Sequence, residues 1–233
     1  MPNGQTRRNG MGQNWMAWIL VGVGLCGWVV ASRADSLDDL LDRIQQTYDQ
    51  TQALSADFVQ VATLTTLNRE QASAGRVYIQ KPYAIRWEYT QPDAQTILYK
   101  DNTLRIYTPK RKQVLQSVIK ADDRSNVALL FLAGIGTLKD AFTVTSLAST
   151  ESQITRLRLV PRSPQAGFTE LHLAVNQQSA FIESLTIHDH IGNRTHIRFA
   201  ALQTHPTLPA DTFDLRLPAD TEVITQPTFS QGR

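Results

Sequence analysis

Two runs of alternating apolar and polar residues meet at Pro82, and they constrain the fold of this chain more than any other feature. Successive side chains of a strand point to opposite faces, so each run has one apolar face. The residues expected on the inward faces are Val77, Ile79, Lys81, Ile85, Trp87 and Tyr89. The β-branched and aromatic content favours strands over a helix. Because proline has no N–H donor, Pro82 belongs at a strand end, a bend or an edge.

The alternation continues into two further segments, residues 96–100 and 104–107. Asp101 and Asn102 lie between them, and both residue types are common in tight hairpin turns. Ile97 and Tyr99 fall on the same inward face as the earlier apolar residues. These segments predict a meander of at least four antiparallel strands.

Short apolar runs bounded by turn residues fill the second half of the chain. The expected strands are residues 142–144, 154–160, 168–175, 181–187 and 195–202, with a last strand at 211–224. The polar residues 68–74 are expected to form a turn before the meander. Because the sequence has no internal repeat and no linker, this spacing predicts one antiparallel sandwich or barrel.

Two segments have the pattern of helices. Residues 35–54 are expected to form an amphipathic helix with Ser36 as its N-cap. Its apolar stripe includes Leu40, Leu41 and Ile44. Residues 125–134 are apolar on most sides, so this helix is expected to be buried or to line an apolar space. Its apolar residues include Leu129, Leu130 and Leu132. Two outcomes stay open: the helices pack tightly on the meander, or they leave an apolar cavity there.

Residues 1–34 have the pattern of a signal peptide. Arg7 and Arg8 precede an apolar run from Trp15 to Val30, and Ser32-Arg33-Ala34 offers a cleavage site before Asp35. One alternative is an uncleaved anchor, for which this run is short, since about 20 residues span a bilayer. Another is lipid attachment at Cys26, where Leu25 stands in place of the small residue expected before such a cysteine. The domain predicted after cleavage is residues 35–233.

Cleavage would change the charge and the cysteine content of the chain. The 23 basic and 21 acidic residues would become 20 and 21, because residues 1–34 hold Arg7, Arg8 and Arg33 and no acid. With a net charge near −1 and no basic stripe, no nucleic-acid partner is expected. Cys26 is the one cysteine, so residues 35–233 can form neither a disulfide nor a thiolate site. The basic residues 110–112 form either a solvated turn or a docking surface for an acidic partner.

Residues with metal-ligand or catalytic chemistry are few. The one group of candidate ligands is His188, Asp189, His190 and His196. His188 and His190 are expected on one face of a strand, but a metal site needs at least three ligands and a supporting shell, so no metal is expected. The sequence also has no nucleophile elbow, phosphate-binding glycine loop or zinc-protease motif. Neither an enzymatic activity nor a cofactor is expected.

A set of short motifs occurs in a fixed order along residues 35–233. They are Ser55-Ala56-Asp57-Phe58-Val59-Gln60, Gln80-Lys81-Pro82, Arg86-Trp87-Glu88-Tyr89, Gln91-Pro92-Asp93, Gln113-Val114, Phe213-Asp214-Leu215-Arg216-Leu217-Pro218 and Glu222-Val223-Ile224. This ordered set resembles the LolA family, the periplasmic carriers of outer-membrane lipoproteins. One departure is Arg105-Ile106-Tyr107, where the family commonly has a tryptophan.

The resemblance implies a mainly β fold, an incomplete antiparallel β-barrel with an α-helical lid. The acyl chains of a lipoprotein would bind inside, against Val77, Ile79, Ile85, Trp87, Tyr89, Ile97, Tyr99, Leu129, Leu130 and Leu132. The lid helix would contribute Leu40, Leu41 and Ile44. The partners implied are acylated lipoproteins, an inner-membrane ABC-type lipoprotein-releasing transporter and an outer-membrane acceptor of the LolB type. We expect a periplasmic monomer. The alternative is a lipid-binding sensor or signalling protein of the same fold.

Lys81 is singled out because its charge falls on the inward face beside Val77 and Ile79. The LolA family has an arginine here that hydrogen-bonds the lid helices in the closed form. Lysine keeps the charge but lacks the planar five-donor fork. Lys81 is therefore expected either to latch the lid or to extend to solvent at the rim of the barrel.

Overall fold

The computed structural model describes residues 36–82, 84–118, 137–163 and 167–226. Residues 1–34 and 35–233 form separate units, and only the second contains described residues. The predicted signal peptide and the predicted helix at 125–134 lie outside the described residues. The same holds for the proposed cavity residues Leu129, Leu130 and Leu132.

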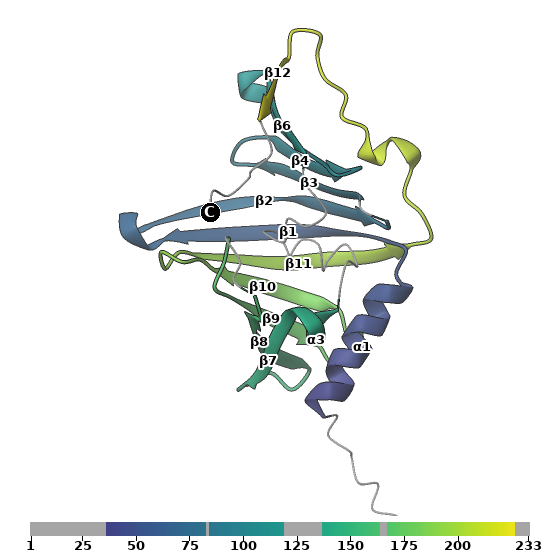
Figure 1. Ribbon diagram of the computed structural model, residues 1–233, viewed down its shortest axis with the longest axis vertical. Coiled ribbons are helices and arrows are strands. Elements are labelled where there is room, and N and C mark those ends of the chain that lie inside the picture. The colour runs from purple at the N-terminus through teal and green to yellow at the C-terminus, as the bar shows by residue number, and fades with distance from the viewer. Residues whose placement is uncertain (1–35, 83, 119–136, 164–166, 227–233) are drawn as a thin grey trace, which may run out of the picture. The chain divides into compact units, whose positions relative to one another are not determined.

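One large sheet dominates residues 35–233 (Figure 1). The first six strands are β1 (Ala53–Leu64), β2 (Arg69–Gln80), β3 (Ala84–Gln91), β4 (Gln95–Lys100), β5 (Thr103–Thr108) and β6 (Gln113–Val118). The others are β7 (Phe142–Leu147), β8 (Ile154–Pro161), β9 (Glu170–Asn176), β10 (Ile182–His188), β11 (Arg194–His205) and β12 (Glu222–Gln226). Their spatial order is β12-β6-β5-β4-β3-β2-β1-β11-β10-β9-β8-β7. The sheet is open, because β12 and β7 are its two edges and do not pair with each other.

Neighbouring strands are antiparallel except for the pair β6 and β12, which is parallel. The predicted meander is confirmed, since β2 to β5 are consecutive in the sheet. The register places Val77 opposite Trp87 and Ile79 opposite Ile85, so the predicted inward residues share one face. We call this the inner face, and we call the opposite one, which carries Tyr78, Arg86 and Leu98, the outer face.

The inner face holds the main core of the protein. Phe58, Val77 and Trp87 are buried there with leucines of β8 and β9. A smaller second core lies on the outer face, where Leu98 and Ala84 pack against Leu208 and Phe213. Leu208 and Phe213 belong to residues 206–221, which we call the strap. The sequence did not predict this second core.

The strap corrects the prediction of a last strand at 211–224. Ala210–Phe213 form the 3₁₀ turn η4, and a strand begins only at Glu222. Pro206, Pro209 and Pro218 explain the difference, since proline lacks the N–H donor that a ladder needs. The strap leaves β11 and leads to β12 at the far edge of the described sheet (Figure 1).

The expected turn at 68–74 is also wrong. β2 already begins at Arg69, and the connection is the short 3₁₀ turn η1 (Thr65–Leu67) followed by Asn68 in the left-handed conformation. The polar residues of this stretch pair with β1, from Thr63 opposite Glu70 to Val59 opposite Ala74. Polarity here marks exposed strand rather than turn.

Two described helices lie beside the sheet. The first, α1 (Leu37–Gln50), is shorter than the predicted 35–54, because Leu54 already belongs to β1. Ser36 caps it as predicted: its hydroxyl accepts from the Asp39 amide, and the Asp39 carboxylate accepts from the Ser36 amide. The short α3 (Leu138–Ala141) is tied to α1 through Lys139, whose Nζ lies 2.7 Å from Asp42. Within the described part of the chain, no helix has the length and apolarity to cross a membrane.

Candidate functional site

The helix α1 covers part of the inner face. Its buried residues are Leu40, Leu41, Ile44 and Tyr48, and all four belong to the main core. Two polar contacts fix the helix against the far half of the sheet. The Arg43 guanidinium donates to the carbonyl of Gln177 at 2.9 Å, and the Ile182 amide donates to the Tyr48 phenol oxygen at 3.3 Å. The lid residues named from the sequence therefore do face the apolar side of the sheet.

A small apolar space remains between α1 and the inner face. It is lined by Tyr48, Leu54, Ala56, Val77, Ile79, Trp87, Ile182, Phe199 and Leu202. Its volume is about 20 Å³, which is room for roughly one water molecule. Side chains therefore nearly fill the space beneath α1, while the second helix expected over the meander, residues 125–134, lies outside the described residues.

The described residues among those predicted to line a cavity divide into two groups. Val77, Ile79 and Trp87 border the apolar space directly. Ile85 is buried in the same core, and Tyr89, Ile97 and Tyr99 pack against it while partly buried. The sequence missed the contributions of β1, β10 and β11, which are Leu54, Ala56, Ile182, Phe199 and Leu202. Alternation marks these residues as apolar, but only the strand order brings them beside Trp87.

Two polar groups stand at this apolar space. Burial raises the pKa of the Tyr48 phenol, and the hydrogen bond from the Ile182 amide only partly opposes that effect, so Tyr48 is neutral. The Trp87 side chain is 5% exposed, and its Nε1 has no hydrogen-bond partner among the described residues. The Trp87 ring meets Phe58 edge to face, with the ring centroids 4.7 Å apart.

Lys81 connects the sheet to the end of α1. Its Nζ donates to the carbonyl of Tyr48 at 2.5 Å and to that of Asp49 at 3.2 Å, and its amide donates to Gln52. The last carbonyls of a helix lack partners within the helix and carry partial negative charge. The last turn of α1 has no basic residue of its own, so Lys81 supplies that cation from the neighbouring strand end.

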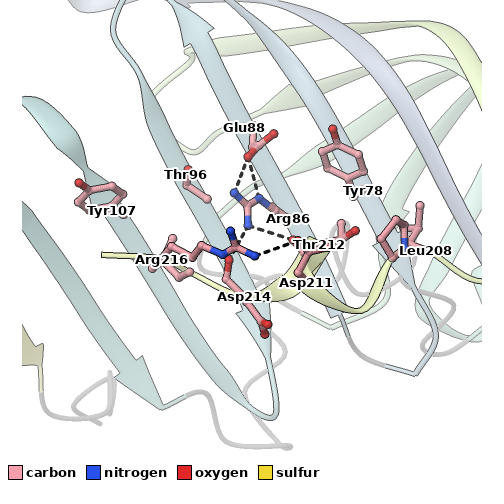
Figure 2. Close-up of a pocket in the computed structure, with 12 residues that line it drawn as sticks. Tyr78, Arg86, Glu88, Thr96, Tyr107, Leu208, Asp211, Thr212, Asp214 and Arg216 are labelled. Atoms are coloured by element: carbon pink, nitrogen blue, oxygen red, sulfur yellow. Dashed lines mark hydrogen bonds and ion pairs between the residues drawn. The ribbon is translucent and has the colours of Figure 1, made fainter. Parts of the chain in front are cut away.

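The outer face carries a separate, polar pocket beneath the strap. It has a volume of about 460 Å³, and Figure 2 shows the Arg86 guanidinium at its centre. The Nη1 of Arg86 donates to the carbonyls of Thr212 and Asp214 at 2.9 and 3.0 Å, while Nε and Nη2 donate to Glu88. Arg86 therefore fastens the strap to β3, and the motif Arg86-Trp87-Glu88 serves both faces of the sheet.

An open groove lies where β10 and β11 separate. The two strands pair only from Ser184 with Arg198 to His188 with Arg194, whereas β11 continues to His205 beside β1. The groove has a volume of about 400 Å³ and is lined by residues 199–202 and 204 of β11 and 179 and 181–183 at the start of β10. It shares Ile182, Phe199 and Leu202 with the apolar space, so these side chains line both the groove and that space.

The histidine group predicted from the sequence does not assemble. His188 lies beside His172 of β9, with the ring centroids 4.6 Å apart, while the His196 Nδ1 lies 2.9 Å from the hydroxyl of Thr186. Asp189 instead accepts from the amides of Ile191 and Asn193 in the following turn. The described group with metal-ligand chemistry is Glu170, His172 and His188, whose ligand atoms lie within 4.8 Å of one another. Both oxygens of the Glu170 carboxylate already have hydrogen-bond partners, Arg158 at Oε2 and His172 at Oε1.

The basic loop at 110–112 is partly neutralised. Lys110 lies 3.3 Å from Asp93, and Lys112 pairs with Asp220 of the strap. The Lys112 carbonyl also accepts from the amide of Glu222, at the start of β12. The Lys110 and Lys112 side chains are 77% and 62% exposed, so these ion pairs are consistent with a solvated turn.

Comparison with known proteins agrees with this architecture. Residues 49–216 match the family described as "Outer membrane lipoprotein carrier protein LolA". An outer-membrane lipoprotein carrier protein from Methylococcus capsulatus is 30% identical over 205 residues, which cover 88% of this chain and 96% of the relative. One from Methylobacillus flagellatus is 28% identical, over 82% of this chain and 90% of the relative. An uncharacterized conserved protein from Thermus thermophilus, at 15% identity, has the same fold, with a TM-score of 0.53 over 82% of this chain and 100% of that one.

Proposed function

Since the chain belongs to the LolA family of outer membrane lipoprotein carrier proteins, we propose that it carries acylated lipoproteins across the periplasm, with their acyl chains held between α1 and the inner face. Residues 1–34 serve in this proposal as a cleavable export signal. The observation that carries it is an apolar sheet face that α1 covers in part, with a space of only about 20 Å³ between the helix and the sheet.

The energetics of acylated cargo make such a carrier necessary. Each buried CH₂ group of an acyl chain contributes about 0.8 kcal/mol of membrane affinity, so two or more chains hold a lipoprotein almost irreversibly. Outside the membrane, an apolar protein surface can bury those chains away from water. No bond is made or broken in this transfer, so the proposed role is that of a carrier and not of an enzyme.

Loading requires α1 to move. The space of about 20 Å³ beneath the helix cannot admit an acyl chain, so the described structure is the closed form. Lys81 is suited to hold this form, because both of its Nζ bonds reach the last turn of α1. Cargo chains then compete with the helix for the same apolar residues. Because closing α1 over the inner face recovers apolar contacts, the closed form offsets part of the free energy lost when cargo leaves. This favours release of the cargo to an acceptor.

In the proposed cycle, an ABC-type transporter of the inner membrane loads the carrier and an acceptor of the LolB type at the outer membrane unloads it. The test is a release assay, in which the purified protein is added to spheroplasts that are making lipoproteins. We expect acylated lipoproteins, but not their unacylated forms, to appear in the soluble fraction as complexes with this chain. The transporter must come from the same source as the chain.

Matched variants locate the site in the same assay. Ile85→Glu places a charge on the inner face, where Ile85 is 4% exposed, and we expect it to abolish release. Val59→Glu makes the same change at a residue that is 54% exposed, and we expect release to continue. Circular dichroism checks that both variants keep their β structure. A folded wild-type protein that releases no lipoprotein would overturn the carrier proposal and favour a sensor of the same fold.

A further inference from the structure

The buried indole N–H of Trp87 is a polar group in an apolar site. Trp87 is 5% exposed, borders the space beneath α1, and leaves its Nε1 without a partner among the described residues. Buried tryptophans usually find an acceptor for this donor, because an unsatisfied buried N–H destabilises the folded state. A phenylalanine would fill the same kind of site without that cost. The donor therefore calls for an acceptor that arrives with a ligand.

The other polar side chain that lines this space, Tyr48, makes no hydrogen bond to Trp87 Nε1. The Tyr48 phenol oxygen already accepts from the Ile182 amide. The remaining lining residues are aliphatic or phenylalanine, namely Leu54, Ala56, Val77, Ile79, Ile182, Phe199 and Leu202. The ring of Trp87 is also held in place, since it packs edge to face on Phe58 and lies 6.2 Å from Phe199, centroid to centroid. The donor is thus fixed in an otherwise apolar setting.

An acyl chain brings one acceptor of its own. Each acyl chain is attached through a carbonyl carbon, so its attached end carries a C=O group while the rest is hydrocarbon. We propose that Trp87 Nε1 donates a hydrogen bond to the ester carbonyl of a bound acyl group, and that this bond distinguishes acyl chains from plain hydrocarbon. The inference rests on the proposed function and names a polar subsite within it.

The position of Trp87 fits the attached end of the chain. The apolar space shares Ile182, Phe199 and Leu202 with the open groove between β10 and β11. The glycerol and peptide parts of the cargo need water, and this groove provides an exit one side chain away from Trp87. The hydrocarbon would then extend along the inner face, toward Ile85, Ile97 and Tyr99.

A pair of lipids that differ only in their carbonyl groups tests the inference. The full chain is titrated with a diacylglycerol and with the dialkylglycerol of the same chain length, whose ether links have no carbonyl. We expect the wild-type protein to bind the ester lipid about five- to tenfold more tightly, the effect of one buried hydrogen bond. Trp87→Phe keeps an aromatic ring but removes the donor, so it should bind the two lipids with equal affinity. Phe199→Leu alters the same wall without touching a donor and should keep the ester preference.

A spectroscopic measurement reports on the hydrogen bond directly in the wild-type protein. In the ¹⁵N-labelled wild-type protein, the Trp87 indole proton should shift downfield with the ester lipid and not with the ether lipid. The Trp87→Phe spectrum identifies this signal among the four tryptophans of the chain. Equal affinities and equal shifts for the two lipids would overturn the inference but leave the carrier proposal standing. Failure to bind either lipid would overturn both.

Discussion

Lys81 supplies α1 with a cation that the helix itself lacks. Because Nζ donates to the Tyr48 and Asp49 carbonyls, these bonds exist only while α1 lies against the sheet. Lysine can make both bonds without the fork of an arginine, since two separate carbonyls, rather than one carboxylate, are the acceptors. The departure from the family arginine is thus compatible with a latch at this position.

Lys81→Met should shift the balance of the lid toward the open form. Losing two charge-assisted bonds costs the closed form roughly 1–2 kcal/mol, so the open fraction rises about 5- to 30-fold. Since cargo binds only the open form in our proposal, affinity for a diacylated lipopeptide should rise and transfer to an acceptor should slow. Titration and transfer kinetics measure the two effects. Lys110→Met, at a side chain that is 77% exposed, is the control, and unchanged affinity in Lys81→Met would contradict the latch.

His188 should make the stability of the protein sensitive to pH. Burial and then the charge of His172 lower the pKa of His188 below its usual value, and Arg194 and Arg158 act in the same direction against the opposing effect of Glu170. The unfolded chain therefore takes up this proton at higher pH than the folded one. The contribution of this pKa shift to the free energy of unfolding is fully present above the ordinary pKa of about 6.5. It is lost as the pH falls through the folded-state pKa of His188.

Thermal unfolding between about pH 7.5 and 5 measures this effect. We expect the midpoint of His188→Gln to fall less steeply with decreasing pH than that of the wild-type protein. His196, whose pKa is lowered by burial and by Arg198 and Arg156, leaves a residual slope. Parallel curves for His188→Gln and the wild-type protein would contradict this account.

The candidate site could be predicted from the sequence only where its residues are local. Alternation around Pro82 placed Val77, Ile79 and Trp87 on one face, and the strand register agrees. Phe199 and Ile182 lie more than ninety residues further along the chain, and no local pattern joins them to Trp87. The unpaired Nε1 of Trp87 was equally beyond prediction, since it depends on what surrounds the ring.

The strap is the element that the sequence described least well. Its run Phe213-Asp214-Leu215-Arg216 alternates as a strand would, yet it pairs with no strand in the described sheet. Phe213 and Leu208 instead pack on the outer face with Leu98, and Arg86 binds the backbone carbonyls on either side of Phe213. An alternating pattern indicates that one side of a segment is buried. It does not indicate whether the backbone hydrogen bonds of that segment are made to a neighbouring strand or to a side chain such as Arg86.

Arg86→Met should loosen this element alone. The variant removes two bonds to strap carbonyls and leaves Glu88 without its cation, at an expected cost of roughly 2–4 kcal/mol in the free energy of unfolding. Limited proteolysis should then cut within residues 206–221 faster than in the wild-type protein. Arg216→Met also removes an arginine of this pocket, but one that is 83% exposed and pairs within the strap, so its digestion should be unchanged. Equal digestion of Arg86→Met and the wild-type protein would show that Arg86 does not hold the strap.

Across the described part of the molecule, the two faces of the sheet are covered by different segments. α1 covers part of the inner face, and the strap covers part of the outer face. Among the described residues, Arg86 and Trp87 are neighbours in β3 whose side chains serve opposite faces. In the proposed function, this division would let the inner face open for cargo while Arg86 keeps the strap attached to the outer face.

Spin labels can test the division directly. With Cys26→Ser to remove the one native thiol, labels at Gln46→Cys on the exposed side of α1 and Val59→Cys on the outer face report the height of the helix above the sheet. A diacylated lipopeptide should lengthen this distance by roughly 4 Å, one layer of carbon contacts. A second pair, Val59→Cys and Val223→Cys, should not change. If the first distance also stays constant on loading, cargo enters without displacing α1.

The parallel pairing of β12 with β6 has a consequence for how the chain is made. Strand β6 ends at Val118, but the strand that covers its free backbone edge does not begin until Glu222. Among the described strands only β12 pairs with this edge, so in a chain synthesised from its N-terminus the edge has no described partner until Glu222–Gln226 have emerged. Such edges are where unfinished sheets join one another. We therefore expect β12 to protect the edge of β6 against aggregation. A chain truncated before Glu222 would lose this protection.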